Sequence, residues 1–265
     1  MPPKRVLTPS SARRVTRVAP SGGDYSSVAA ALTFAAAQSP SAANRWMVML
    51  YPGTYNEDLT LQNYVDVVGV GPPGAVTLNG RHTGAVCRLQ NVTVDFSGGT
   101  PGAILTYGGS AATAFELVDL RASCTTAGLR IVDMTGSGAI QLTRCQFKAR
   151  DSALKQSNGS LLAEDCCFEI DSSGLGYPFH STGGTLFELR RCTLIGAGTN
   201  GAALFASASV ATARLLHCTL RKGSAATYSI DTSTTPTITT VGCLANASAA
   251  AAVSGVVDLV VDAGI

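Results

Sequence analysis

The sequence predicts an all-β protein whose single chain winds into a parallel β-helix of about eight coils, each of about 25 residues. Two observations support this fold. Similar short segments recur at intervals of 21 to 28 residues from about residue 70 onward. Within each segment, apolar and polar residues alternate, as in a strand with one buried face. The stretches between repeats are rich in glycine, serine and threonine, which favours turns over helices.

Each repeat is centred on one anchor residue, with apolar or small residues at positions −5, −3, 0 and +2. The alternation before and after the anchor predicts two strands, and the polar pair at −2 and −1 predicts a corner between them. The following Gly-rich stretch would return the chain to the next coil. Five repeats have a cysteine as their anchor: Cys145, Cys166, Cys192, Cys218 and Cys243. Three earlier repeats have Val70, Val92 and Leu120.

The anchor cysteines should form one inward column, with one thiol per coil. Zinc binding or disulfide formation is one interpretation of such a column. We favour reduced, packed thiols, because tetrahedral zinc needs converging ligands while a column places the sulfur atoms along a line. Cys167 falls at an outward position and is expected to be the most reactive thiol.

A leucine-rich repeat is the rival fold, because its period and its Leu-x-Leu pattern are similar. Leucine-rich repeats spend the rest of each unit on a helix or 3₁₀ turn with further leucines. The return segments of this chain, such as GAGTNGAALFASAS, contain glycine and serine instead. The pattern therefore favours the β-helix.

The N-terminal region divides into an extended basic arm, residues 1–20, and the start of the β-helix domain, residues 21–265. The first 23 residues contain five basic side chains and no acid. The predicted partner-binding residues of this arm are Lys4, Arg5, Arg13, Arg14 and Arg17. Behind the arm, the alanine-rich segment DYSSVAAALTFAAAQ predicts one helix over about residues 26–38.

Three segments between about residues 18 and 80 resemble the opening coils of the pectin lyase-like superfamily, and of pectin methylesterases in particular. They are VAPSGGDYSSVAAAL, YPGTYNEDLTL and VDVVGVGPPGAVTLNG. The resemblance implies a right-handed parallel β-helix whose N-terminal end is covered by the 26–38 helix. It also implies Gln-Asp-Thr, Asp-Phe and Gly-Arg-Pro-Trp catalytic segments in the enzymes. The Gln-Asp-Thr and Gly-Arg-Pro-Trp segments are absent from this sequence, and the dipeptide Asp95-Phe96 occurs without them. No catalytic residue therefore carries over.

The residues just before the anchors alternate in charge along the solenoid: Asn91, Asp119, Arg144, Asp165, Arg191 and His217. Arginines beside the acids should lower their pKa values, the opposite of what a general acid needs. We interpret the column as ion pairs between coils. The densest acidic cluster is Glu164, Asp165, Glu169 and Asp171, and cation binding there is the alternative. We expect no catalytic residue, no metal and no cofactor.

The chain also resembles non-catalytic β-helix proteins of phage particles, because β-helices of this superfamily recur in tail spikes and on capsid surfaces. Together with the observations above, this resemblance implies a non-enzymatic structural protein of a virus particle, a decoration or cement protein of a phage capsid. We expect the arm to anchor it to other virion proteins, in many copies or as a homo-oligomer, within a virion assembled in the host cytoplasm. No apolar run is long enough to span a membrane, and the first 20 residues lack the apolar stretch of a signal peptide. The alternative is a tail or neck fibre or spike that binds or degrades polysaccharide, as a lyase or hydrolase. A surface glycan would then be a partner.

Overall fold

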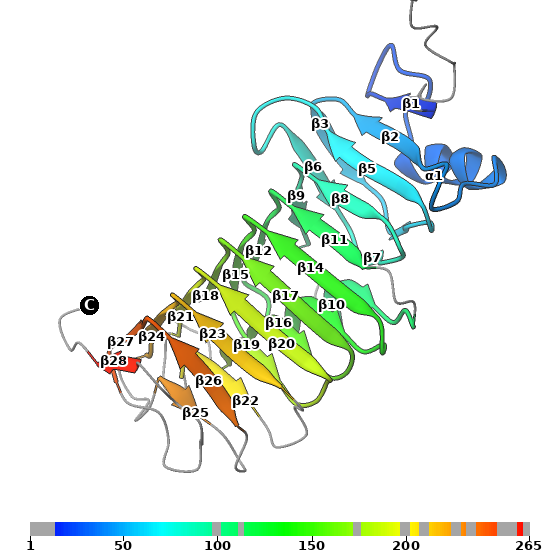
Figure 1. Ribbon diagram of the computed structural model, residues 1–265. Coiled ribbons are helices and arrows are strands. Elements are labelled where there is room, and N and C mark those ends of the chain that lie inside the picture. Colours follow the sequence, from blue (N-terminus) through cyan, green and yellow to red (C-terminus); the bar gives the residue numbers. More distant parts are fainter. Residues whose placement is uncertain are drawn as a thin grey trace, which may run out of the picture.

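The computed structural model describes residues 14–96, 102–110, 114–171, 176–196, 202–206, 212–223, 229–231, 237–247 and 259–261. The chain forms a parallel β-solenoid with three sheets running along its length (Figure 1). The sheets contain 10, 10 and 8 strands, and we call them the first, second and third sheets in the order in which a coil visits them. The all-β parallel solenoid class is confirmed.

The strands of the three sheets follow one another in register. The first sheet contains β1 (Arg14–Val18), β2 (Trp46–Leu50), β5 (Val65–Gly69), β8 (Arg88–Gln90), β11 (Phe115–Val118), β14 (Ala139–Thr143), β17 (Ser160–Glu164), β20 (Leu186–Arg190), β23 (Ala213–Leu216) and β26 (Ile238–Val241). The second contains β3 (Gly53–Asn56), β6 (Val76–Asn79), β9 (Thr93–Asp95), β12 (Arg121–Cys124), β15 (Gln146–Ala149), β18 (Cys167–Ile170), β21 (Thr193–Ile195), β24 (Thr219–Arg221), β27 (Cys243–Ala245) and β28 (Leu259–Val261). The third contains β4 (Leu59–Thr60), β7 (His82–Thr83), β10 (Gly102–Tyr107), β13 (Leu129–Met134), β16 (Ser152–Gln156), β19 (Tyr177–Ser181), β22 (Leu204–Ala206) and β25 (Ile230–Asp231).

The sequence predicted two strands per coil, and the structure has a third strand in most coils, which together form the third sheet. Its strands lie in the segments that we had interpreted as Gly-rich returns. Their outward residues are often three positions apart, as Arg130 and Asp133 are in β13, so they lack the period of two that marks a strand.

The core consists of columns of apolar residues stacked from coil to coil. Phe115, Ile140, Leu161 and Phe187 pair in succession across the first sheet, as their spacing predicts, and all four are buried. Each coil covers the apolar face of the next, so the stack stabilises what one coil could not.

The corner between the first and second sheets is made by residues with a left-handed backbone. All six residues that precede the anchors from Val92 to Cys218 have φ between 50° and 55°. They are Asn91, Asp119, Arg144, Asp165, Arg191 and His217. Gly242, before the last anchor, has φ 58°. The corner amides continue the ladder between coils: Asp119 N donates to Thr143 O at 3.0 Å, and Arg144 N donates to Glu164 O at 2.9 Å. The corner predicted at positions −2 and −1 is therefore present in each of these coils.

Helix α1 (Val28–Ala37) lies at the N-terminal end of the solenoid, one to two residues shorter at each end than predicted (Figure 1). Val28 and Leu32 are among its buried residues. The Glu57 carboxylate accepts hydrogen bonds from the Ser27 hydroxyl at 2.8 Å and from Val28 N and Ala29 N at 2.9 Å each. Glu57 thus holds the start of the helix against the coil, where unpaired amides and the helix dipole favour an anion.

The rest of the Pro-Gly-x-Tyr-x-Glu motif is also structural. The Tyr55 hydroxyl lies within hydrogen-bond distance of two backbone carbonyls, Tyr51 O at 2.8 Å and Val18 O at 3.1 Å, and shares its one hydrogen between them. Gly53 packs so closely on Pro20 that an added Cβ would lie 2.7 Å from the proline ring. This motif, which carries the resemblance, therefore shapes the first coil.

The last residues of the predicted arm belong to the solenoid. Arg14–Val18 forms β1, the terminal strand of the first sheet, and pairs in parallel with β2. Thr16 is buried and accepts a hydrogen bond from Trp46 Nε1 at 2.8 Å. Arg17 forms a 3.2 Å ion pair with Asp24. Lys4, Arg5 and Arg13 lie outside the described residues. Within the described part of the chain, no helix is long and apolar enough to cross a membrane.

Candidate functional site

The charge column at the corner forms ion pairs between successive coils. Arg144 Nε lies 2.7 Å from Asp119 Oδ1, one coil away. Arg191 contacts both Asp165, at 2.7 Å, and Glu164, at 2.6 Å. The hydrogen bond from Arg191 lowers the pKa of Asp165. Asp165 is thereby held ionised, as the sequence predicted.

Glu164, Asp165 and Glu169 of the dense acidic cluster form ion pairs with basic side chains and do not converge on one point. Glu169 forms a 2.6 Å ion pair with Lys148, while Glu164 and Asp165 share Arg191. Among the described residues, no group of three His, Cys, Asp or Glu side chains is placed to hold a metal ion.

A second set of ion pairs crosses the outer face of the first sheet. Arg45 pairs with Asp66, and Arg88 pairs with Glu116 at 2.6 Å. Glu188, which is 6% exposed, lies between Arg190 and Arg214 and pairs with both. Ion pairs thus form at both ends of this outward column, separated by Gln141 and Leu162, and each exposed pair adds little stability.

The anchor cysteines form the inward column that the sequence predicts, and each of them is free and buried. Each thiol donates to a backbone carbonyl: Cys145 to Leu117 O at 3.3 Å, and Cys218 to Leu189 O at 3.3 Å. Contact with the preceding thiol, together with burial, raises the pKa of Cys192 and of Cys218 to about 12. A protonated, buried thiol is a poor nucleophile. The column is therefore a packing element.

An aromatic cluster on the outer face of the third sheet escaped the sequence analysis. The half-buried rings of Tyr177 and His180 on β19 meet Phe205 on β22. The Phe205 centroid lies 4.9 Å from that of Tyr177 and 4.9 Å from that of His180. We call these three residues the aromatic cluster. The sequence places two of them only three positions apart in a stretch without period-two alternation, so nothing marked them as neighbours.

The aromatic cluster continues into a charged row. In register across the strands, Asp133, Lys155, His180 and Phe205 follow one another. Burial, together with the nearby cations Lys155 and Arg130, lowers the pKa of His180 to about 4. His180 is therefore neutral at pH 7. Flat rings beside hydrogen-bonding groups and a cation are suited to stacking on a sugar and orienting it.

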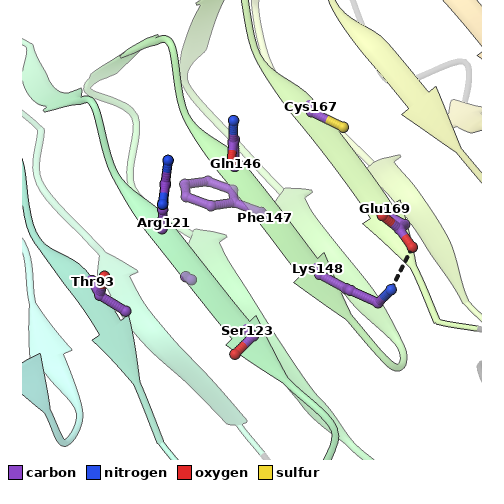
Figure 2. A pocket seen from close by; sticks show the side chains of 9 residues that line it. Thr93, Arg121, Ser123, Gln146, Phe147, Lys148, Cys167 and Glu169 are labelled. Carbon is purple, nitrogen blue, oxygen red and sulfur yellow. Dashed lines mark hydrogen bonds and ion pairs between the residues drawn. The ribbon is translucent and has the colours of Figure 1, made fainter. Parts of the chain in front are cut away.

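A groove of about 460 Å³ lies on the second sheet (Figure 2). It is lined by Thr93, Arg121, Ala122, Ser123, Gln146, Phe147, Lys148, Cys167 and Glu169. Cys167 is half-buried at its edge, and burial raises the pKa of this thiol. The prediction that Cys167 points away from the core agrees with this position, while the raised pKa reduces its intrinsic reactivity.

No protein-family model matches the chain, and no curated protein matches it in sequence. Three solved structures are similar to it in fold. Escherichia coli YbhC has a TM-score of 0.60 at 11% identity, over 85% of this chain and 76% of that chain. The pectin methylesterase of Aspergillus niger has a TM-score of 0.59 at 14% identity, over 94% and 91%. Pectin methylesterase PemA from Erwinia chrysanthemi has a TM-score of 0.52 at 12% identity, over 82% and 80%. The chain thus shares the parallel β-helix fold of these pectin methylesterases, as the resemblance of its opening coils implies.

Proposed function

We propose that this chain is a non-enzymatic structural protein of a virus particle, a decoration protein on a phage capsid that is attached through its N-terminal segment. The observation that carries the proposal is the pairing of acids with arginine or lysine over the outer faces. Because these acids are ion-paired, we recognise no pair of catalytic carboxyl groups among the described residues of the β-helix.

The paired acids are poorly suited to polysaccharide cleavage. Glycoside hydrolysis uses two carboxyl groups, one of which has a raised pKa and gives a proton to the leaving group. In this structure the Asp165 carboxylate is bound by Arg191, and its pKa is lowered. An arginine-bound carboxylate keeps its charge and is a weak proton donor at neutral pH.

The attachment proposal rests on where the basic segment joins the fold. Lys4, Arg5 and Arg13 precede β1, and β1 is the terminal strand of the first sheet at one end of the solenoid (Figure 1). A segment leaving from one end can engage an acidic groove or a sheet edge of another virion protein. The solenoid would then project from the attachment point.

Deletion of residues 1–13 tests the attachment. The cut stops before β1, because Thr16 and Val18 are buried in the fold. Full-length and truncated protein are compared for binding to purified particles that lack this protein, at two salt concentrations. We expect the truncated protein to melt at the same temperature and to lose binding, and high salt to weaken binding of the full-length protein. Equal binding of both forms would contradict the proposal.

The aromatic cluster favours a second candidate function, a fibre or spike protein whose third sheet binds polysaccharide. Phe205→Ala removes the ring that contacts both Tyr177 and His180. In affinity electrophoresis through gels containing pectin, alginate or host surface polysaccharide, retardation that disappears in Phe205→Ala would support this function. Phe34→Ala is the matched control, because Phe34 is 41% exposed and lies at the other end of the solenoid, on α1. Absence of retardation on every polysaccharide would remove this candidate.

A further inference from the structure

The groove on the second sheet contains a positive charge that the described protein does not neutralise. Arg121 is exposed at the start of β12, and none of the ion pairs among the described residues involves it. The other cation of the groove, Lys148, is already paired with Glu169 at 2.6 Å. Arg144 and Arg191, which lie on the neighbouring corner, each have a carboxylate partner. Arg121 therefore lines this concave surface as a cation without an ion-pair partner among the described residues.

The groups around Arg121 can add hydrogen bonds to the same anion. Thr93, Arg121 and Gln146 are in register on β9, β12 and β15, and Ser123 lies two residues farther along β12. Parallel strands are about 4.8 Å apart, and two residues along a strand cover about 6.6 Å. These four side chains thus span an area about the size of one sugar ring, with Arg121 between Thr93 and Gln146. Figure 2 shows the Arg121 and Gln146 side chains standing beside each other above the groove.

We propose that this groove binds a sugar-sized ligand that carries one oxyanion, a phosphate, sulfate or carboxylate group, held by the Arg121 guanidinium. The planar guanidinium offers paired N–H donors that match such an oxyanion. The Gln146 amide and the Ser123 hydroxyl supply further donors, and the side-chain stems give the ring of the ligand an apolar surface. The Lys148–Glu169 pair closes one side of the groove (Figure 2). The site lies on a different sheet from the aromatic cluster, so the two can be tested separately.

Isothermal titration calorimetry on the full-length protein tests the proposal. The probes are glucose 6-phosphate, glucose 6-sulfate, glucuronate, glucose and inorganic phosphate. We expect at least one charged sugar to bind at least 10-fold more tightly than both glucose and inorganic phosphate. Arg121→Gln should weaken that binding by roughly 10-fold to 100-fold, the effect of losing a charge-assisted hydrogen bond.

Two controls keep the result specific. Arg221→Gln changes an exposed arginine on β24 of the same sheet, which forms no ion pair within the described residues and is absent from the groove lining. Arg221→Gln and Phe205→Ala should both bind as the unchanged protein does, and thermal melting should show that Arg121→Gln is folded. Binding that Arg121→Gln leaves intact, an equal loss in Arg221→Gln, or no binding of any charged sugar would overturn the proposal. Equal affinity for inorganic phosphate and the best charged sugar would overturn its sugar component.

Discussion

Arg144 and Asp119 form an ion pair across one coil boundary, with Nε and Oδ1 2.7 Å apart, and both have a left-handed backbone with φ of 53° and 54°. Glycine is the usual residue in this conformation, and other residues pay about 1–2 kcal/mol to adopt it. In this chain polar residues occupy the corner, and their side chains lie over the outer surface where they pair with the next coil. The same residues therefore form the left-handed corner and provide the alternating charges that pair between coils.

Substitutions at Arg144 separate the backbone strain from the ion pair. Both Arg144→Gly and Arg144→Val remove the pair with Asp119, which is exposed and worth less than about 1 kcal/mol. Glycine relieves the strain, whereas a β-branched residue increases it. We expect Arg144→Gly to change the free energy of unfolding by less than about 1 kcal/mol and Arg144→Val to lower it by about 2 kcal/mol, measured by urea denaturation. Equal effects of the two variants would show that the backbone conformation is not the controlling factor.

Glu57 should make a large contribution to the N-terminal cap. Glu57→Ala removes three hydrogen bonds at the start of α1, so we expect the free energy of unfolding to fall by about 2–4 kcal/mol. The fluorescence of Trp46 reports the change, because its ring lies 5.8 Å from that of Phe34 on the helix. Glu116→Ala is the control: it breaks an exposed pair with Arg88 and should cost less than about 1 kcal/mol. A Glu57→Ala effect as small as the control's would contradict this role.

His82 should make the protein sensitive to mild acid. It is 2% exposed, and neither ring nitrogen forms a hydrogen bond of normal geometry. Burial lowers its pKa to about 4, whereas an unfolded histidine titrates near 6.5. The unfolded state therefore binds the proton first, and stability is lost as pH falls from about 6.5 to about 4, by up to about 3 kcal/mol.

His82→Leu checks this assignment, because Leu59 and Leu105 flank His82 in register. We expect urea denaturation to show a more stable variant at every pH and a smaller loss of stability between pH 6.5 and 4. His180, whose pKa is also lowered to about 4, leaves a residual dependence. An unchanged pH slope in His82→Leu would contradict the assignment.

Native thiol labelling distinguishes the cysteine column from the surface. We expect maleimide to label Cys167 first, since this thiol is half-buried, and the five anchor cysteines to react after unfolding. Cys167→Ser should remove the fast phase seen by mass spectrometry. Fast labelling of Cys192 in the folded protein would show that the column is open.

Much of the fold is predictable because two of the three strands per coil have strict alternation. The anchors, the column through Phe115, and the corner pairing of Arg144 with Asp119 all follow from that period. The third sheet does not, since Tyr177 and His180 face outward three residues apart and their strand reads as a return loop. The left-handed corner was equally hidden, because arginine and aspartate occupy positions where glycine would have signalled it. That Arg121 forms no ion pair with a described residue could not be predicted, because it depends on which acids pair with the other arginines. Those pairs form between residues of different coils and are known only once the coils are stacked.

The proposed structural role requires that the described acids neither cleave nor de-esterify polysaccharide. The most direct test incubates the purified protein with pectin, polygalacturonate and alginate beside a pectin methylesterase control, and measures methanol, reducing ends and unsaturated sugars. We predict no product above the blank on any substrate. Product formation that is lost in Asp165→Asn or Asp133→Asn would contradict the account and establish an enzyme.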